Sequence, residues 1–349
     1  MEAMPVHHPT SILPFFLETS AFQVEKLAGG HIHDTWKVSI EHVPRYILQR
    51  INTNIFIDPQ RLMDNIYRVT SHLQQHYPQH TNLRLLPTLS GQTCYSNQSE
   101  TWRMFHYIPN SFTNSIPQNP DQVYEAGRIT AQFTFQMAAF PPEALYVPLP
   151  DFHNTPKRYR DLQNAISQAN PQRLARCSSE LAWIKERAPR LGTLWDALTT
   201  SAIPWRVTHN DTKLDNVLFD RNTQRAICLI DLDTVMASSA LFDYGDALRS
   251  MGNPAAEDEA DLSKVQFQES IYEAYTQGYL SIAGNFLTPV EMKLLPTAPW
   301  IITIENGIRF LCDYLQGDRY YRISYPNQNL NRCRTQLKLA ADIEFAFSF

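Results

Sequence analysis

The stretch VTHNDTKLDNVLFDRNTQRAICLIDLD, residues 207–233, is the most informative part of this 349-residue chain. Two short apolar runs within it, 217–219 and 226–230, flank a polar turn at 220–223. This pattern is typical of a β-hairpin. Because a hairpin returns its two ends to the same edge of a sheet, we expect the polar residues before it and after it to lie together.

His209, Asp211 and Asn216 precede the hairpin, and Asp231 follows it. Phosphoryl transfer needs such a set, because one carboxylate must accept the proton of the incoming hydroxyl while a second carboxylate and an amide oxygen hold Mg²⁺. Asp211 and Asn216 are five residues apart, the spacing of the catalytic-loop aspartate and asparagine of protein kinases. Lys213 stands where its charge would meet the transferred phosphoryl group.

The ordered set predicts in-line transfer of the γ-phosphoryl group of ATP to a small-molecule hydroxyl. Asp211 would act as the base, and Asn216 and Asp231 as ligands of Mg²⁺. We expect Asp233 to assist the metal or to brace its loop, and His209 to support the loop. The alternative is that these residues only form turns and caps beside a hairpin. The complete order of the set favours the catalytic interpretation.

The chain around this stretch divides into two parts of different character. Before residue 108 the apolar pattern predicts a small antiparallel sheet with a covering helix, and beyond it mainly helices. The expected strands are two within 22–38 and others at 45–52, 83–89 and 101–108, with a helix at 58–77; later helices are expected at 123–140, 156–169, 172–188, 190–200, 241–251, 262–282, 289–316 and 327–345. The sequence thus indicates an α+β chain with a nucleotide-binding lobe at 1–108 and a lobe at 109–349 that carries the catalytic loop and the acceptor site.

The composition excludes several classes of protein. A hydrophobic fraction of 43% supports real cores, and a net charge of −5 argues against nucleic acid as a partner. No apolar run approaches the roughly 20 residues of a membrane-spanning helix. Five dispersed cysteines and an N-terminus without signal-peptide features indicate a cytoplasmic protein. The sequence sets no oligomeric state.

The motif from His209 to Asn216, with the triplet LID at 229–231, resembles those of the aminoglycoside phosphotransferase and choline kinase superfamily. The runs GGHIHDTWKV, YILQRIN, HNDTKLDNVLFD, LFDYGDALRS and IRFLCDYLQGDRYY are similar to those of bacterial N-acetylhexosamine 1-kinases. The resemblance implies a protein-kinase-like fold, with a small N-terminal antiparallel β lobe and a larger, mainly helical C-terminal lobe. It also implies a role in carbohydrate metabolism: ATP- and Mg²⁺-dependent phosphorylation of the anomeric hydroxyl of N-acetylglucosamine or N-acetylgalactosamine.

Several residues of the N-terminal part are candidates for the nucleotide and substrate sites. Gly29 and Gly30 are expected to cover the phosphates, and His31 to serve that loop or to reach the substrate. Protein kinases place a lysine on the third strand, and Arg50 is the candidate replacement here, although a shift of one residue would place Gln49 there instead. The adenine pocket is expected to be walled by Phe105 and Tyr107.

The C-terminal part holds the candidate acceptor site. Asp243 and Asp246 are expected to brace the catalytic loop, and the resemblance places Arg309 and Tyr320 in a sugar pocket. Competing interpretations are a kinase of choline, homoserine or an aminoglycoside, and a non-catalytic nucleotide-binding pseudokinase. A cationic acceptor would require an acidic or aromatic-lined pocket, whereas Arg309 favours a neutral, oxygen-rich acceptor.

Overall fold

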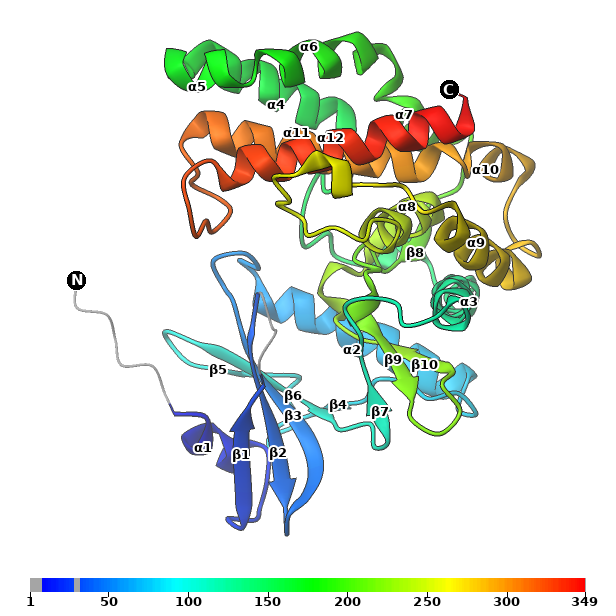
Figure 1. Cartoon of the computed structure of the whole chain (residues 1–349). Helices are drawn as coiled ribbons and strands as arrows, with labels where there is room; N and C mark the ends of the chain where they lie inside the picture. Colours follow the sequence, from blue (N-terminus) through cyan, green and yellow to red (C-terminus); the bar gives the residue numbers. More distant parts are fainter. Residues whose placement is uncertain (1–7, 28–31, 349) are drawn as a thin grey trace.

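The computed structural model describes residues 8–27 and 32–348 and shows two lobes (Figure 1). The smaller lobe contains an antiparallel sheet and a long helix, and the larger lobe is mainly helical. This architecture confirms the expected α+β, kinase-like fold class. Among the described residues, no helix has the length and apolar character needed to span a bilayer.

The sheet of the smaller lobe has the strand order β1-β2-β3-β6-β4, with β5 also paired to β6. The strands are β1 (Phe22–Lys26), β2 (Asp34–Ile40), β3 (Val43–Ile51), β4 (Leu85–Leu86), β5 (Tyr95–Ser96) and β6 (Thr101–His106). The strand expected at 83–89 is only two residues long, and β5 was not expected. The chain turns away at Pro87, whose nitrogen has no hydrogen to donate to a ladder.

Helix α2 (Pro59–His76) covers this sheet, as the sequence predicted. Asp58 caps its first turn by accepting the backbone N–H of Arg61 at 3.1 Å, and Pro59 occupies the first helical position, where no partner is needed. Leu62, Ile66 and other apolar residues at helical spacing are buried. The helix therefore presents one apolar face to the core.

The two faces of the sheet contact different cores, because side chains alternate along each strand. Ile51 and Phe105 belong to the large core that extends into the helical lobe. Leu48 and Trp102 belong to a smaller core with α1 (Pro9–Ile12). We call these the inner and the outer face, and only the inner face looks towards the second lobe.

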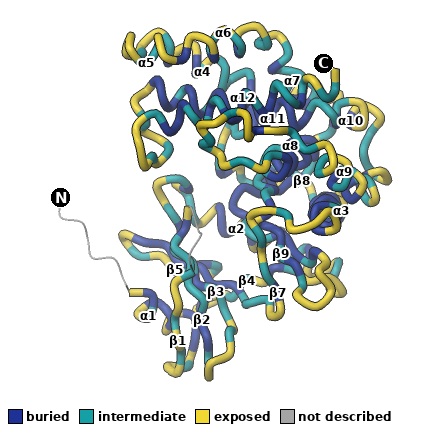
Figure 2. Tube along the Cα trace, viewed as in Figure 1, coloured by how far each residue is buried: buried dark blue, intermediate teal, exposed yellow. Residues whose placement is uncertain are grey.

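The helical lobe is built around α11, which packs against α12, α8 and α4. Figure 2 shows the buried trace concentrated in α3, α8 and α11, with α5 and α6 more exposed. The helices of this lobe are α3 (Pro120–Gln136), α4 (Thr155–Gln168), α5 (Pro171–Arg176), α6 (Ser178–Arg187), α7 (Thr193–Thr199), α8 (Ala240–Met251), α9 (Glu269–Ala283), α10 (Pro289–Leu294), α11 (Thr297–Gln316) and α12 (Gln328–Phe347).

Some helix boundaries differ from the prediction. The helix expected at 172–188 is interrupted at Cys177, and the one expected at 289–316 is interrupted before Thr297. Pro296, which precedes α11, has no N–H to continue the first helix. Helix α9 starts later than expected, after a short 3₁₀ turn at Leu262–Lys264.

Two small sheets carry the informative stretch 207–233. Strands β9 (Val217–Asp220) and β10 (Ala226–Leu229) pair antiparallel, which confirms the predicted hairpin. Strands β8 (Arg206–Thr208) and β11 (Met236–Ser238) form the second sheet. Strand β7 (Ser111–Phe112), which follows the linker from the smaller lobe, pairs with β9. The two acidic ends of the hairpin therefore lie beside the junction of the lobes.

Candidate active site

The loop between β8 and β9 brings Asp211, Lys213 and Asn216 together. Lys213 Nζ lies 3.0 Å from Asp211 Oδ2, and Asn216 Nδ2 donates to the same oxygen at 2.9 Å. Asn216 also donates to the backbone carbonyl of Asp211 at 2.9 Å. Both side-chain bonds use Oδ2, and among the described residues Asp211 Oδ1 has no hydrogen-bond partner. One carboxylate oxygen is thus fixed and the other is available to a ligand.

Asp243, at the start of α8, contacts the loop that it was expected to brace. Its carboxylate is fully buried and accepts the backbone N–H groups of His209 at 2.8 Å and Asn210 at 2.6 Å. The hydroxyl of Thr212 donates to its carbonyl at 2.5 Å. Burial raises the pKa of the Asp243 carboxyl, and His209 opposes that rise. Three residues of the loop are therefore tied to one helix end.

His209 supports the loop from inside. Its Nε2 lies 2.9 Å from the carbonyl of Ile230, and its backbone carbonyl accepts the hydroxyl of Thr234 at 2.7 Å. These bonds join the catalytic loop to the segment that carries Asp231. The ring is fully buried, so a direct contact with a substrate is excluded in this conformation.

Asp246 lies one helical turn after Asp243 and pairs with Arg249 at 2.9 Å. Burial raises the pKa of Asp246, but Arg249 and His153 outweigh it, and the pKa lies below the usual range. Lys213 contributes to this lowering as well, so Asp246 lies near the catalytic loop. Its carboxylate therefore balances the positive charges behind the loop.

Asp231 follows β10 in the left-handed region, with φ 64° and ψ 61°. Its carboxylate, that of Asp233 and the His33 ring offer atoms within 4.8 Å of one another. Burial raises the pKa of Asp231 well above its usual range, and the nearby carboxylates of Asp233 and Asp211 raise it further. A divalent cation bound by the Asp231 carboxylate would relieve this repulsion, and carboxylate oxygens are the ligands that Mg²⁺ prefers.

Asp233 is engaged by two groups from the smaller lobe. Arg103 pairs with both of its oxygens, Nη1 with Oδ1 and Nη2 with Oδ2 at 2.8 Å, and His33 Nε2 lies 2.6 Å from Oδ2. Burial raises the pKa of Asp233, but Arg103 and then His33 hold it far below its usual range. Of the two expected roles, this geometry favours bracing over metal binding.

Arg103 and His33 were missed by the sequence reasoning. Arg103 stands in the apolar run of β6, where nothing marks it as functional, and His33 lies two residues beyond the His31 that was singled out. Their partner Asp233 is 130 residues from Arg103 and 200 residues from His33 in sequence. Spacing within the chain carries no signal for such contacts.

The structure does not bring Arg50 to Asp211 or Asp231. Arg50 is opposite Trp102 in the β3–β6 register, so it lies on the outer face, where it pairs with Asp34 and, at 2.8 Å, with Glu100. This argues against the expected phosphate-binding role. Gln49 lies on the inner face instead, opposite Arg103.

For the other residues predicted to bind the nucleotide, the structure gives fewer contacts. Gly29, Gly30 and His31 lie outside the described residues. Phe105 is buried in the large core, with the Arg103 guanidinium 5.3 Å from its ring centroid. Tyr107 is half-buried and starts the linker between the lobes.

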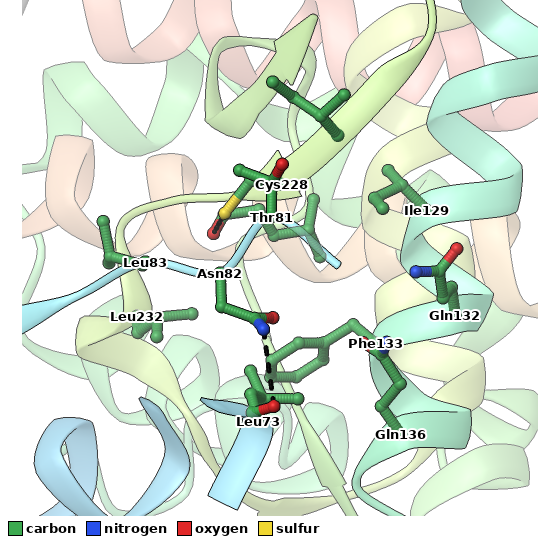
Figure 3. Close-up of a pocket in the computed structure, with 12 residues that line it drawn as sticks. Leu73, Thr81, Asn82, Leu83, Ile129, Gln132, Phe133, Gln136, Cys228 and Leu232 are labelled. Atoms are coloured by element: carbon green, nitrogen blue, oxygen red, sulfur yellow. Dashed lines mark hydrogen bonds between the residues drawn. The ribbon is translucent and has the colours of Figure 1, made fainter. Parts of the chain in front are cut away.

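A small cavity lies between α2, α3 and β10 (Figure 3). Leu73, Phe133 and Cys228 line it, and Asn82 donates to the Leu73 carbonyl across one side at 3.3 Å. Its volume of about 20 Å³ holds about one water molecule. It is too small for a nucleotide or an acceptor.

A much larger cavity, of about 470 Å³, opens beside α11 and α4. Arg309 and Tyr320, the predicted sugar-binding residues, both line it. The Arg309 guanidinium lies between two aromatic rings, 5.5 Å from the centroid of Phe152 and 5.8 Å from that of Tyr321. Within residues 8–27 and 32–348, no hydrogen bond or ion pair to this guanidinium is formed.

Both carboxylates in the wall of this cavity have partners within the protein. Asp313 accepts the backbone N–H groups of Arg319, Tyr320 and Tyr321 at 2.8–3.0 Å. Asp161 pairs with Lys157 at 2.8 Å. The cavity therefore offers aromatic faces and a guanidinium that has no ion pair within the described part of the chain.

Comparison with known proteins places this geometry in context. The phosphotransferase enzyme family matches residues 23–286. A microcompartment-associated aminopropanol kinase superposes with a TM-score of 0.67 and 17% identity, over 97% of this chain and 96% of that one. An aminoglycoside phosphotransferase from Alicyclobacillus acidocaldarius gives 0.62 and 15%, over 99% and 98%. A choline kinase from Cryptosporidium parvum gives 0.60 and 13%, over 97% and 96%.

Proposed function

The chain belongs to the phosphotransferase enzyme family, and from that premise we propose that it transfers the γ-phosphoryl group of ATP to the anomeric hydroxyl of N-acetylglucosamine or N-acetylgalactosamine. The proposal combines two parts of the molecule. The loop at Asp211 supplies the chemistry, and the cavity at Arg309 supplies the choice of acceptor.

Asp211 has the geometry of a base that orients a hydroxyl. Lys213 and Asn216 fix one of its oxygens, and the other, which has no hydrogen-bond partner among the described residues, would accept the proton of the acceptor hydroxyl. Lys213 lies close enough to neutralise charge on the transferred group. Asn216 and Asp231 are the residues that would hold Mg²⁺, which supplies charge stabilisation to the triphosphate when bound.

The observation that carries the choice of acceptor is the unpaired Arg309. A guanidinium offers several donors to hydroxyl and acetamide oxygens, while the rings of Phe152 and Tyr321 offer flat apolar faces to a sugar. An acceptor with an ammonium group, such as the aminopropanol or choline of the kinases named above, would meet the positive charge of Arg309, which has no ion-pair partner among the described residues. The cavity thus favours a neutral acceptor rich in oxygen.

A panel of acceptors tests this proposal through ADP release. N-Acetylglucosamine and N-acetylgalactosamine are expected to be turned over, and choline and homoserine are not. The methyl glycoside of N-acetylglucosamine is the matched control, since it lacks only the free anomeric hydroxyl, and it is expected to bind without turnover. Turnover of the methyl glycoside would place the reaction at another hydroxyl, and turnover of choline alone would overturn the sugar assignment.

A further inference from the structure

Strand β3 lacks the lysine that protein kinases place there, and the structure shows which residue takes over that space. Gln49 points to the inner face from β3, and its partner directly across the ladder on β6 is Arg103. Gln49 Oε1 accepts Arg103 Nε at 2.9 Å. On the inner face, the cation that looks towards the second lobe is therefore Arg103 on β6, directly opposite Gln49 on β3.

Arg103 has no solvent contact of consequence. The residue is 1% exposed, and its two Nη groups donate to Asp233, with Nη1 also 4.0 Å from Met63 Sδ. A buried guanidinium is tolerated when a carboxylate and further hydrogen bonds compensate it, and here Asp233 and Gln49 do so. The pair therefore joins the sheet of the smaller lobe to the segment that carries Asp231.

His33 forms a second contact between the smaller lobe and Asp233. Its Nδ1 accepts the backbone N–H of Asn52 at 3.0 Å, so Nε2 carries the proton and donates to Asp233. Asn52 follows β3 directly, which fixes the ring to the sheet. Asp233 is thereby held by two side chains that belong to the other lobe.

The backbone at Asp231 needs such support. A non-glycine residue in the left-handed region is strained and persists only where its surroundings fix it. Before Asp231, the N–H of Ile230 bonds the carbonyl of Asn216 at 2.9 Å, and its carbonyl lies 2.9 Å from His209 Nε2. After Asp231, the anchor is Asp233. The metal-binding candidate is therefore clamped on both sides.

We propose that Arg103 and His33 are positioning residues for the phosphoryl transfer, which hold Asp231 in its metal-binding conformation by gripping Asp233 across the lobes. Neither touches the nucleotide or the acceptor in this role. The proposal rests on the activity of the family and on the assignment of Asp231 as a metal ligand. It does not depend on which acceptor is used, so its outcome is separable from that of the acceptor panel.

The test measures Mn²⁺ binding by electron paramagnetic resonance, in the presence of ADP, together with thermal unfolding. Arg103→Met, the paired variant Arg103→Met/Asp233→Leu and His33→Leu are compared with the unchanged chain. Loss of outer-shell partners of a metal ligand typically lowers metal affinity by about 10- to 100-fold. We expect a loss of this size for Arg103→Met and a smaller one for His33→Leu.

The paired variant separates positioning from stability. Replacing both charges by apolar groups is expected to recover much of the melting temperature that Arg103→Met loses, while Mn²⁺ affinity stays low. Arg206→Met/Glu291→Leu is the matched control, because that pair is also bidentate, at 2.9 and 3.0 Å, with a buried carboxylate and a half-buried guanidinium. It is expected to change stability without changing Mn²⁺ affinity.

Two results would overturn the proposal. If Asp233 were itself a metal ligand, freeing it from Arg103 would leave Mn²⁺ affinity unchanged or higher in Arg103→Met. If the bridge served stability alone, the paired variant would recover Mn²⁺ affinity along with its melting temperature. Should Arg103→Met fail to fold, the paired variant and His33→Leu decide between the same outcomes.

Discussion

The loop at Asp211 and the cavity at Arg309 differ in whether their polar side chains have hydrogen-bond partners. Around the loop, Asp243 and His209 are buried and bond to backbone groups, and Asp233 is buried and bonds to the side chains of Arg103 and His33. These groups are therefore held in place without a ligand. In the cavity, Arg309 has no hydrogen-bond or ion-pair partner among the described residues, and the carboxylates of Asp313 and Asp161 bond to other groups. Under the proposed function, the groups for the reaction are preorganised, while the acceptor is selected by a guanidinium that has no ion-pair partner among the described residues.

The largest expected effect belongs to the one carboxylate oxygen that the loop leaves available. Asp211→Asn is expected to lower kcat by about 10²- to 10⁴-fold, because proton transfer by a positioned base contributes that much. Thermal unfolding is expected to stay close to that of the unchanged chain. Asp215→Asn, at an exposed acid in the same loop, is the control and should retain activity. Near-normal turnover of Asp211→Asn would remove Asp211 from the role of base.

The next effect concerns the support of the loop. Asp243→Ala would leave the buried N–H groups of His209 and Asn210 without their acceptor, and we expect a loss of roughly 2–5 kcal/mol in the free energy of unfolding. Chemical denaturation measures it. Asp121→Ala, also an acid in the first turn of a helix but exposed, should change stability by less than about 0.5 kcal/mol. Equal losses at both positions would show that the helix start, rather than the loop, is affected.

Arg309 tests the other side of the comparison. Arg309→Met is expected to raise KM for N-acetylhexosamines by about 10- to 100-fold, the value of a hydrogen bond to a charged group, with KM for ATP unchanged. Steady-state kinetics with both substrates varied separates the two constants. Arg160→Met, an exposed arginine on the nearby α4, should leave both unchanged. A fall in kcat at constant acceptor KM would instead place Arg309 in the reaction machinery.

The smallest effect is expected at Tyr320, whose side chain lines the cavity but is 65% exposed. Tyr320→Ala should raise the acceptor KM by about threefold, since an aromatic contact contributes on the order of 1 kcal/mol and less at an exposed site. Tyr320→Phe, which keeps the ring, should lie within twofold (roughly 0.4 kcal/mol) of the unchanged chain. An effect as large as that of Arg309→Met would mean that the segment closes over the acceptor.

The parts of the site that the sequence predicts are formed by residues close to one another in the chain. The hairpin follows from alternation over a few residues, and Asp211, Lys213 and Asn216 share one loop, so their spacing fixes their proximity. Arg50 shows the limit of such reasoning. A shift of one residue along β3 exchanges the inner for the outer face, and the register is set by β6, more than 50 residues away.

The contacts that spacing does not encode were not predicted. Arg103 looked like part of an apolar core strand, and only the packing of the two lobes shows that it reaches Asp233. The surroundings of Arg309 are equally non-local: its guanidinium lies between Phe152 and Tyr321, and Asp313, four residues later in the chain, accepts backbone N–H groups that follow α11. Which charged groups pair in a folded site depends on contacts between residues far apart in the chain, and these contacts cannot be predicted from a single sequence.

The most direct test of the central claim is a phosphorus NMR time course of the purified protein with Mg-ATP and equal amounts of N-acetylglucosamine, N-acetylgalactosamine, choline and homoserine. Our account predicts a new phosphate resonance coupled to an anomeric proton, with the same resonance absent from the Asp211→Asn variant. Phosphocholine or phosphohomoserine as the product would contradict the assignment of the acceptor. Loss of ATP with no acceptor-dependent product would contradict the proposed sugar 1-kinase activity.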